Sequence, residues 1–291
     1  MKKQKTVSIK AKLLGVIIPV VIAIVVVLVV AAYQISAGTI KKYSQNLLQS
    51  SVENQASQIE AWLNENLASF QMAKTIIEDL KPSDEELKTI LDGYYGFNSN
   101  YPEGLYVADS TGQLITASES TKKESDVTNS TWYKEGLTRV NMAVGSAYQN
   151  ADGVNVISAS GILNDGSDKV RVISADMTLD RIAIIVNSFI EMNDAEAFLV
   201  DKTSGVILAN RDSSLISQTL GAEGQSHFYQ LTAEKAAEKD YNFATLDGNM
   251  TVFQEVDGTN WLLISYIPTS IVLSDLTQLR NIMIVISVIC I

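Results

Sequence analysis

Residues 105–118 read LYVADSTGQLITAS, and residues 197–210 read AFLVDKTSGVILAN. Each stretch holds two short apolar runs separated by polar residues and a glycine, a pattern that predicts a β-hairpin. Because the second stretch repeats the first, the chain is expected to contain two small α/β modules, each built on a mainly antiparallel sheet.

The segments around these hairpins show the periods of further strands and helices. Alternating apolar residues predict strands at 143–149, 154–163 and 169–177 in the first module, and at 241–246, 250–256 and 261–267 in the second. Helices are predicted at 179–189 and 227–240. Asp257-Gly258 is typical of a tight hairpin turn between the last two strands.

A long helical pattern precedes the first module. Apolar side chains recur mostly at steps of three, four or seven residues, at Ile35, Ile40, Tyr43, Leu47, Val52, Ile59, Leu63, Phe70, Ile77 and Leu80. No proline interrupts the pattern before Pro82, which predicts a stalk helix of roughly 65–70 Å. Its apolar face suits either a second copy in a dimer or the sheets of the same chain. Ser83 and Glu86 form a capping box that begins a shorter second helix.

The segment from Leu13 to Ala32 contains twenty residues without a charge. A helix of that length spans about 30 Å, the thickness of the hydrocarbon core of a bilayer. A cleaved signal peptide is the alternative, but its apolar region is shorter, roughly 7–15 residues. The run therefore predicts a transmembrane helix.

Charge sets the expected orientation of this helix. The first twelve residues contain five lysines and no acidic residue, so the N-terminus is expected to stay cytoplasmic. All 33 acidic residues lie beyond Ala32. The large segment outside the cell is therefore strongly acidic, which argues against nucleic acid or anionic lipid as its partner.

The C-terminal segment is also apolar. Arg280 is the last charged residue, and residues 281–291 read NIMIVISVICI. These residues are interpreted as the start of a second transmembrane helix, which follows an exit helix that begins at Thr269. The alternative is a short apolar tail that packs on the preceding domain. Cys290 is the only cysteine, so no internal disulfide is expected.

In this order of parts the chain resembles a double Cache sensor domain over roughly residues 34–279. The resemblance is carried by VADSTGQ at 107–113, TWYK at 131–134, SAY at 146–148 and VISADMTL at 172–179. It implies an α+β fold in which a long N-terminal helix carries two PAS-like modules between two transmembrane helices. Such a domain stands outside the cell, and its membrane-distal module binds the ligand.

The resemblance also implies a division of the chain. The expected parts are a cytoplasmic N-terminus (1–12), transmembrane helix 1 (13–33), the stalk helix (34–82), the membrane-distal ligand-binding module (83–190), the membrane-proximal module (191–268), and the exit helix with the start of transmembrane helix 2 (269–291). A homodimer is expected, with a cytoplasmic signalling domain or kinase beyond the chain end.

The resemblance implies a ligand site in the distal module. The predicted ligand-binding residues are Ser130, Trp132, Tyr133, Tyr148, Asn150 and Asp176. In amino-acid-binding members an arginine two residues before the Trp-Tyr pair clamps the ligand carboxylate, and an aspartate at the end of the last strand binds the ammonium. Here Asp176 matches, but Ser130 stands at the arginine position. Ser125 and Asn150 likewise stand where a tyrosine and an acid are common.

Losing a bidentate arginine removes the carboxylate clamp. The expected ligand is therefore an amine, an amino-acid-like compound or a small heterocycle, without a carboxylate recognised in this way. Arg139 and Arg171 are the alternative anion clamps. Trp132 and Tyr133 also suit the core of the module, and Asp176 also suits a helix cap before residue 179.

No catalytic signature is present, and neither a metal nor a cofactor is expected. With a single histidine, His227, and a single cysteine, zinc and Cys-His catalytic sites are excluded. The predicted function is extracytoplasmic small-molecule sensing with transmembrane signalling, most like a chemotaxis receptor. The alternatives are the sensor region of a histidine kinase or diguanylate cyclase, and a membrane-tethered surface module that senses nothing.

Overall fold

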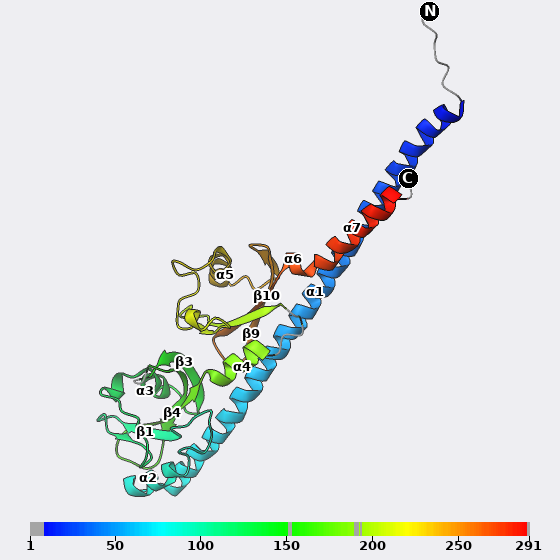
Figure 1. Cartoon of the computed structure of the whole chain (residues 1–291). Helices are drawn as coiled ribbons and strands as arrows, with labels where there is room; N and C mark the ends of the chain where they lie inside the picture. Colours follow the sequence, from blue (N-terminus) through cyan, green and yellow to red (C-terminus); the bar gives the residue numbers. More distant parts are fainter. Residues whose placement is uncertain (1–8, 151–152, 189–191, 193, 290–291) are drawn as a thin grey trace, which may run out of the picture.

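A single helix organises the molecule. The computed structural model describes residues 9–150, 153–188, 192 and 194–289. Helix α1 (Ile9–Leu80) contains 72 residues, a length of about 108 Å. The apolar run and the stalk are thus one helix, and Pro19 lies inside it. Among the described residues, α1 is the one helix with an apolar stretch long enough to cross a membrane. Both modules lie along one side of α1 (Figure 1).

Helix α2 (Asp84–Asp92) begins directly after α1. Ser83 caps it: the Ser83 hydroxyl accepts a hydrogen bond from the Glu86 N–H, and the Glu86 carboxylate accepts one from the Ser83 N–H at 2.9 Å. The capping box predicted from the sequence is confirmed, since both reciprocal hydrogen bonds are present.

The distal module contains a five-stranded antiparallel sheet of order β2-β1-β5-β4-β3. Its strands are β1 (Leu105–Asp109), β2 (Leu114–Ile115), β3 (Ala143–Gln149), β4 (Asn155–Leu163) and β5 (Arg171–Thr178). The short helices η1 (Val127–Asn129) and α3 (Thr131–Gly136) connect β2 to β3. Helix α4 (Asp180–Ser188) follows the sheet.

The proximal module has the same strand order, β7-β6-β10-β9-β8. Its elements are β6 (Glu196–Asp201), β7 (Ile207–Ala209), η2 (Ser213–Leu215), α5 (His227–Ala237), β8 (Ala244–Leu246), β9 (Asn249–Val256) and β10 (Trp261–Pro268). The repeat of hairpins in the sequence is therefore a repeat of sheets in space. The predicted α+β class with two mainly antiparallel modules on a long helix is confirmed.

The two hairpin turns that repeat in the sequence use the same chemistry. In the first, one carboxylate oxygen of Asp109 accepts hydrogen bonds from the Thr111 N–H at 2.8 Å and its hydroxyl at 2.6 Å. In the second, Asp201 accepts from the Ser204 N–H at 2.8 Å. Gly112 and Gly205 have φ of 85° and 72°, a conformation that costs glycine little. The aspartate and the glycine of each repeat are thus needed by the turn itself.

The Asp109 turn predicts a pH-dependent stability. Burial opposes ionisation of Asp109, but hydrogen bonds from Lys169, Thr111 and the Gln113 N–H outweigh it and lower the pKa from 3.8 to about 2. Because the folded pKa is depressed, the carboxylate stabilises the fold above about pH 4 and loses that contribution as the pH falls towards 2, a difference of about 2 kcal/mol. Denaturant unfolding of wild type and Asp109→Asn should show a gap that shrinks across this window.

Lys169→Met is the control for this prediction. In the wild type, the Lys169 ammonium lies 2.6 Å from the second Asp109 oxygen. Without it the pH window should move up towards the ordinary aspartate range. A gap between wild type and Asp109→Asn that stays constant from pH 7 to pH 2 would contradict the assignment.

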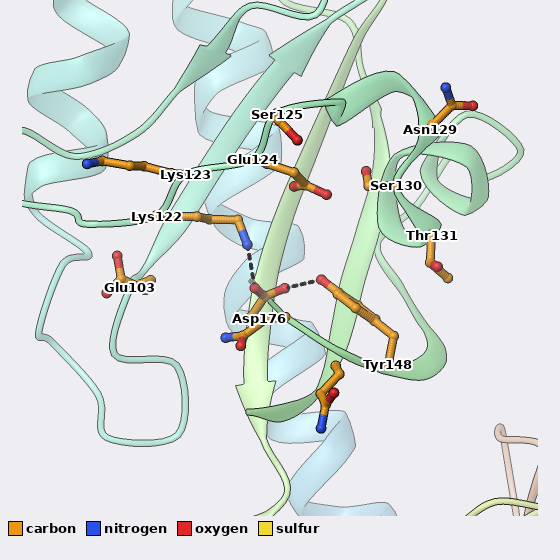
Figure 2. A pocket seen from close by; sticks show the side chains of 12 residues that line it. Glu103, Lys122, Lys123, Glu124, Ser125, Asn129, Ser130, Thr131, Tyr148 and Asp176 are labelled. Atoms are coloured by element: carbon orange, nitrogen blue, oxygen red, sulfur yellow. Dashed lines mark hydrogen bonds and ion pairs between the residues drawn. The ribbon is translucent and has the colours of Figure 1, made fainter. Parts of the chain in front are cut away.

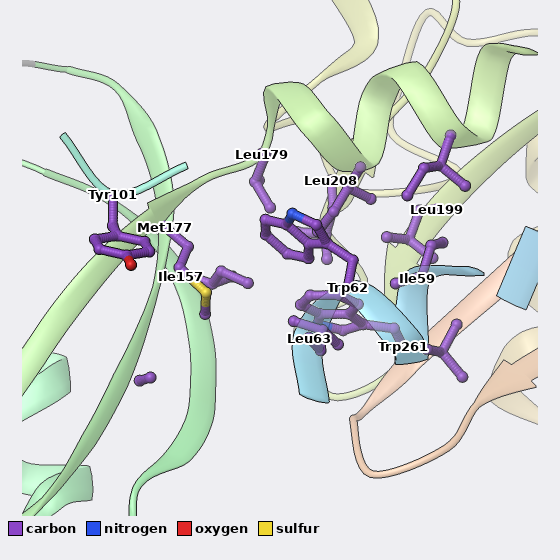
Figure 3. Packing of buried hydrophobic residues seen from close by; sticks show 14 of the residues in the cluster. Ile59, Trp62, Leu63, Tyr101, Ile157, Met177, Leu179, Leu199, Leu208 and Trp261 are labelled. Carbon is purple, nitrogen blue, oxygen red and sulfur yellow. The ribbon is translucent and has the colours of Figure 1, made fainter. Parts of the chain in front are cut away.

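The apolar face of α1 packs on the sheets of its own chain. The predicted face residues Val52, Ile59, Leu63, Phe70 and Ile77 are buried in one cluster with side chains of both sheets. Figure 3 shows the junction of the two modules, where α1 residues meet side chains of the distal and the proximal module. The predicted face residues nearer the ends of the pattern, Ile35, Tyr43 and Leu80, are exposed. Over residues 48–77 the apolar face of the stalk therefore packs on the sheets of the same chain, which was the second of the two predicted alternatives.

The C-terminal helix is broken once. Where the sequence predicted one helix from Thr269, the structure has α6 (Thr269–Val272) and α7 (Ser274–Ile289), separated at Leu273. Helix α7 runs back along the N-terminal half of α1 (Figure 1), with the Arg280 guanidinium 5.8 Å from the Tyr33 ring centroid. The chain thus leaves the proximal module beside the helix by which it entered.

Several element boundaries differ from the predicted ones. Helix α5 ends at Ala237 instead of 240, and β8 begins at Ala244 instead of 241, because Lys239 has φ 55° and Asp240 accepts hydrogen bonds in the turn. Helix α3 was not predicted, since six residues are too short to show a period. Residues 1–8, the helix end at Phe189, the module boundary at 190/191 and Cys290 lie outside the described residues.

Candidate functional site

A cavity of about 690 Å³ opens on the distal module (Figure 2). It lies between the segment that connects β2 to α3, the end of β3 and the end of β5. Its lining residues are Glu103, Lys122, Lys123, Glu124, Ser125, Asn129, Ser130, Thr131, Tyr148, Gln149, Asn150 and Asp176. Four of the six predicted ligand-binding residues belong to this set: Ser130, Tyr148, Asn150 and Asp176.

The alternation of β5 aims Asp176 at this cavity. Ile173, Ala175 and Met177 belong to the core against α1, so their neighbours face the opposite side of the sheet. That side carries Val172 in the apolar cluster around Trp132. Asp176 extends this second face to the cavity wall, and it is 6% exposed.

Hydroxyl groups from three strands converge on one oxygen of Asp176. Its Oδ1 accepts hydrogen bonds from Tyr106 at 2.5 Å, Ser158 at 2.5 Å and Tyr148 at 3.0 Å. These residues come from β1, β4 and β3, and Ser158 stands directly opposite Asp176 in the ladder. The sheet register therefore places three hydroxyl donors around one oxygen of this carboxylate.

The tyrosines of this network stay protonated. Burial raises the pKa of Tyr106 well above its ordinary value, and the adjacent Asp176 charge raises it further. The same two causes, in the same order, raise the pKa of Tyr148. Both phenols therefore act as hydrogen-bond donors to the carboxylate throughout the physiological range.

Lys122 occupies the other side of the carboxylate. Its Nζ lies 2.6 Å from Asp176 Oδ2 and 4.2 Å from the centroid of the Tyr106 ring. Figure 2 shows the Lys122 side chain pointing to Asp176 from the segment between β2 and η1. The ammonium thus combines an ion pair with a cation–π contact.

Trp132 and Tyr133 form the layer behind the cavity and are not part of its lining. Trp132 is fully buried, and its ring meets the Tyr106 ring edge to face at a centroid distance of 4.9 Å. Its Nε1–H donates to the Glu124 carboxylate at 2.9 Å. Trp132 therefore supports two groups next to the site, Tyr106 and Glu124.

Ser130 and Asn150 make local hydrogen bonds. The Ser130 hydroxyl donates to the Val127 carbonyl at 2.5 Å, and the Asn150 side-chain oxygen accepts from the Val154 N–H at 2.9 Å. Both residues shape the segments on which they lie while one side of each faces the cavity.

The alternative anion clamps lie elsewhere. Arg139 pairs with Glu135 at 3.4 Å, and Arg171 pairs with Asp165 at 2.7 Å and with Asp84. Neither arginine lines the cavity, where the described cations are Lys122 and Lys123. Asp176 lies four residues before α4 begins, and its carboxylate is engaged by the side chains of Tyr106, Lys122, Tyr148 and Ser158, which argues against the helix-cap interpretation.

Sequence reasoning missed Lys122, Tyr106 and Ser158. Lys122 lies in an irregular segment among other charged residues, where nothing in the pattern distinguishes it from a surface lysine. Tyr106 and Ser158 lie in strands that were predicted, on the sheet face opposite to α1. The alternation of each strand therefore gave the face on which they lie, but not their shared partner Asp176. Within the described part of the chain, no cluster of three or more side chains suits a metal ion.

A comparison with protein families matches residues 32–276 to the model described as Cache domain (dCache_1). A search of curated protein sequences found no significant match. Among solved structures, the ligand-binding domain of the Pseudomonas fluorescens chemoreceptor CtaA in complex with L-isoleucine is similar, with a TM-score of 0.65 and 20% identity, covering 82% of this chain and 98% of that one.

Two further structures have the same fold. The Campylobacter jejuni chemoreceptor Tlp3 ligand-binding domain with L-norvaline has a TM-score of 0.64 and 17% identity, covering 80% of this chain and 94% of that one. The corresponding domain of the Pseudomonas aeruginosa amino-acid chemoreceptor PctC with GABA has a TM-score of 0.59 and 19% identity, covering 77% and 99%.

Proposed function

Since this chain belongs to the Cache domain family, we propose that it senses a small molecule outside the cell and signals across the membrane, with the ligand bound in the distal cavity. The observation that carries the proposal is the buried Asp176 carboxylate with the Lys122, Tyr106, Tyr148 and Ser158 side chains that contact it. A buried carboxylate with converging donors, at the wall of a cavity of about 690 Å³, is typical of a small-molecule site.

The proposal extends to the class of receptor. The similar structures are ligand-binding domains of chemoreceptors in complex with small amino acids. Their likeness in fold supports a chemotaxis receptor as the setting of this domain. The alternatives are the sensor region of a histidine kinase or of a diguanylate cyclase, and a membrane-tethered surface module that senses nothing.

The arrangement of helices supports transmembrane signalling. Helix α1 contacts both modules and continues into the apolar run, and α7 lies beside it. We infer that the five N-terminal lysines hold the N-terminus in the cytoplasm and that the modules stand outside. A ligand that binds one arrangement of the distal module better than another would bias the position of α1, and with it the pair α1 and α7.

The domain division, the homodimer and the second membrane span remain proposals of the same kind. Residues 83–190 are proposed as the ligand-binding module, and residues 191–268 as the module between it and the membrane. Because α7 emerges with Ile282, Ile284 and Val285 exposed, it suits a helix that enters a bilayer.

A ligand screen on the full chain in detergent micelles tests this function. The panel contains amino acids, amines, small organic acids and nucleobases, and the measurement is the melting temperature. A ligand at a hundred times its dissociation constant stabilises the folded state by about 2.7 kcal/mol. We expect this stabilisation to be lost in Asp176→Asn, because the substitution removes the charge around which Lys122 and the three hydroxyl groups of the cavity wall are arranged.

Asp109→Asn is the matched control, because Asp109 is a buried carboxylate of the same sheet with hydroxyl and lysine partners but lies away from the cavity. It should keep the ligand response. A ligand that stabilises wild type and Asp176→Asn equally would show that binding occurs somewhere other than the distal cavity.

A further inference from the structure

We infer that Lys122 is a tethered occupant of an ammonium subsite, so that the cavity disfavours ligands with an ammonium group and favours neutral or anionic ones. The inference rests on the proposed function and concerns its ligand class. It argues against an amine, which is one of the ligand classes suggested by the sequence. The carboxylate that would bind an amine, Asp176, is already paired with the Lys122 ammonium.

The surroundings of the Lys122 Nζ are those of a bound ammonium ion. The Nζ lies 2.6 Å from Asp176 Oδ2 on one side and 4.2 Å from the centroid of the Tyr106 ring on another. The other oxygen of Asp176 accepts hydrogen bonds from three hydroxyl groups. Carboxylate and aromatic face together are what a free ligand ammonium would use.

The other carboxylates of the cavity are engaged differently. Glu124 accepts the Trp132 indole N–H at 2.9 Å, and Glu103 accepts the Ser120 hydroxyl at 2.5 Å. Lys122 lies on neither of them. Asp176 is thus the carboxylate that the structure pairs with a cation, and the side chain of Lys122 is only 11% exposed in that position.

An external ammonium would compete with a tethered one. A group held by a short flexible tether acts at an effective concentration of millimolar or higher. A free amine therefore has to exceed that concentration, or gain contacts elsewhere, before it replaces Lys122. A neutral or anionic ligand needs no such exchange, and the lysine charge remains available to it.

The test removes the tether and returns the ion. Lys122→Ala deletes a propylammonium fragment, so n-propylammonium chloride is the probe, with sodium chloride at equal ionic strength as the reference. The full chain in detergent micelles is melted with increasing probe. At ten times the dissociation constant the melting temperature of Lys122→Ala should rise by roughly 3–6 °C. Wild type should show no rise beyond that with sodium chloride.

Two controls identify the subsite. Lys123→Ala removes the neighbouring lysine of the same cavity and should gain no response to propylammonium. Lys122→Ala/Asp176→Asn removes the anion as well and should lose the response of the single variant. Rescue of Lys122→Ala that survives the loss of Asp176, or no rescue at all, would overturn the inference.

A second variant covers the case in which Lys122→Ala does not fold. Lys122→Met keeps the aliphatic stem, and ammonium chloride then supplies the missing ion: stabilisation beyond sodium chloride supports the inference, and its absence overturns it. The proposed function is judged separately. A ligand response of wild type that is abolished in Asp176→Asn supports the sensor function even if rescue by the ion fails. Rescue by the ion without any such ligand response supports only the ammonium subsite.

Discussion

Replacing Asp176 by alanine is expected to lower the free energy of unfolding by roughly 3–5 kcal/mol. The substitution leaves the Lys122 ammonium without its counter-ion, and it removes the acceptor of three hydroxyl groups at once. Of these hydroxyls, the one on Tyr106 belongs to a side chain that is 1% exposed, so water does not replace the lost acceptor. The measurement is denaturant unfolding of the full chain in micelles, followed by tryptophan fluorescence.

Asp176→Asn separates the two causes of this loss. The amide keeps an acceptor for the hydroxyls and removes only the charge, so its cost should be smaller than that of alanine. A double-mutant cycle of Lys122→Ala and Asp176→Ala then measures the ion pair itself. A cost below about 1 kcal/mol for Asp176→Ala would mean that the converging hydrogen bonds do not form in solution.

Replacing Trp132 by alanine is expected to cost roughly 3–5 kcal/mol as well, but by another mechanism. The side chain is fully buried between the Tyr106 and Tyr133 rings, with centroid distances of 4.9 Å and 5.8 Å. Its removal leaves a cavity in the layer that supports Tyr106, and it frees Glu124 from the indole N–H. Circular dichroism during denaturant unfolding measures this loss without depending on the deleted fluorophore.

Trp261→Ala is the matched control. Trp261 belongs to the proximal module, and it is 1% exposed in the core at the junction of the two modules. Its removal should therefore cost a similar free energy of unfolding. At a temperature at which both variants are folded, the ligand response should fall in Trp132→Ala and persist in Trp261→Ala. Loss of the response in both variants, or in neither, would contradict the supporting role of Trp132 in the distal site.

The fold was largely predictable because its signals are local. The hairpins at 105–118 and 197–210 each contain their own turn aspartate and glycine, and both turns form the hydrogen bonds that this chemistry predicts. The capping box at Ser83 and the apolar stripe of α1 depend on residues three to seven positions apart. Helix α3 escaped prediction because six residues complete fewer than two turns.

The site was only partly predictable because its contacts are not local. Ser130, Tyr148, Asn150 and Asp176 entered by resemblance, and the structure gathers them at one cavity. The resemblance did not indicate that Trp132 would lie behind the cavity wall. It also contained no information on Lys122, which reaches Asp176 across 54 residues of sequence.

The amino-acid sequence by itself determined the long helix, the apolar run that is long enough to cross a membrane, the two repeated antiparallel modules and the acidic character of the segment that follows the run. These properties follow from period, charge and turn chemistry within a few residues. Only the tertiary structure decided that the stalk packs on the sheets of its own chain and that Lys122 pairs with Asp176 at the cavity. Strand register and the path of an irregular segment place those groups together, and both depend on contacts between residues far apart in the chain.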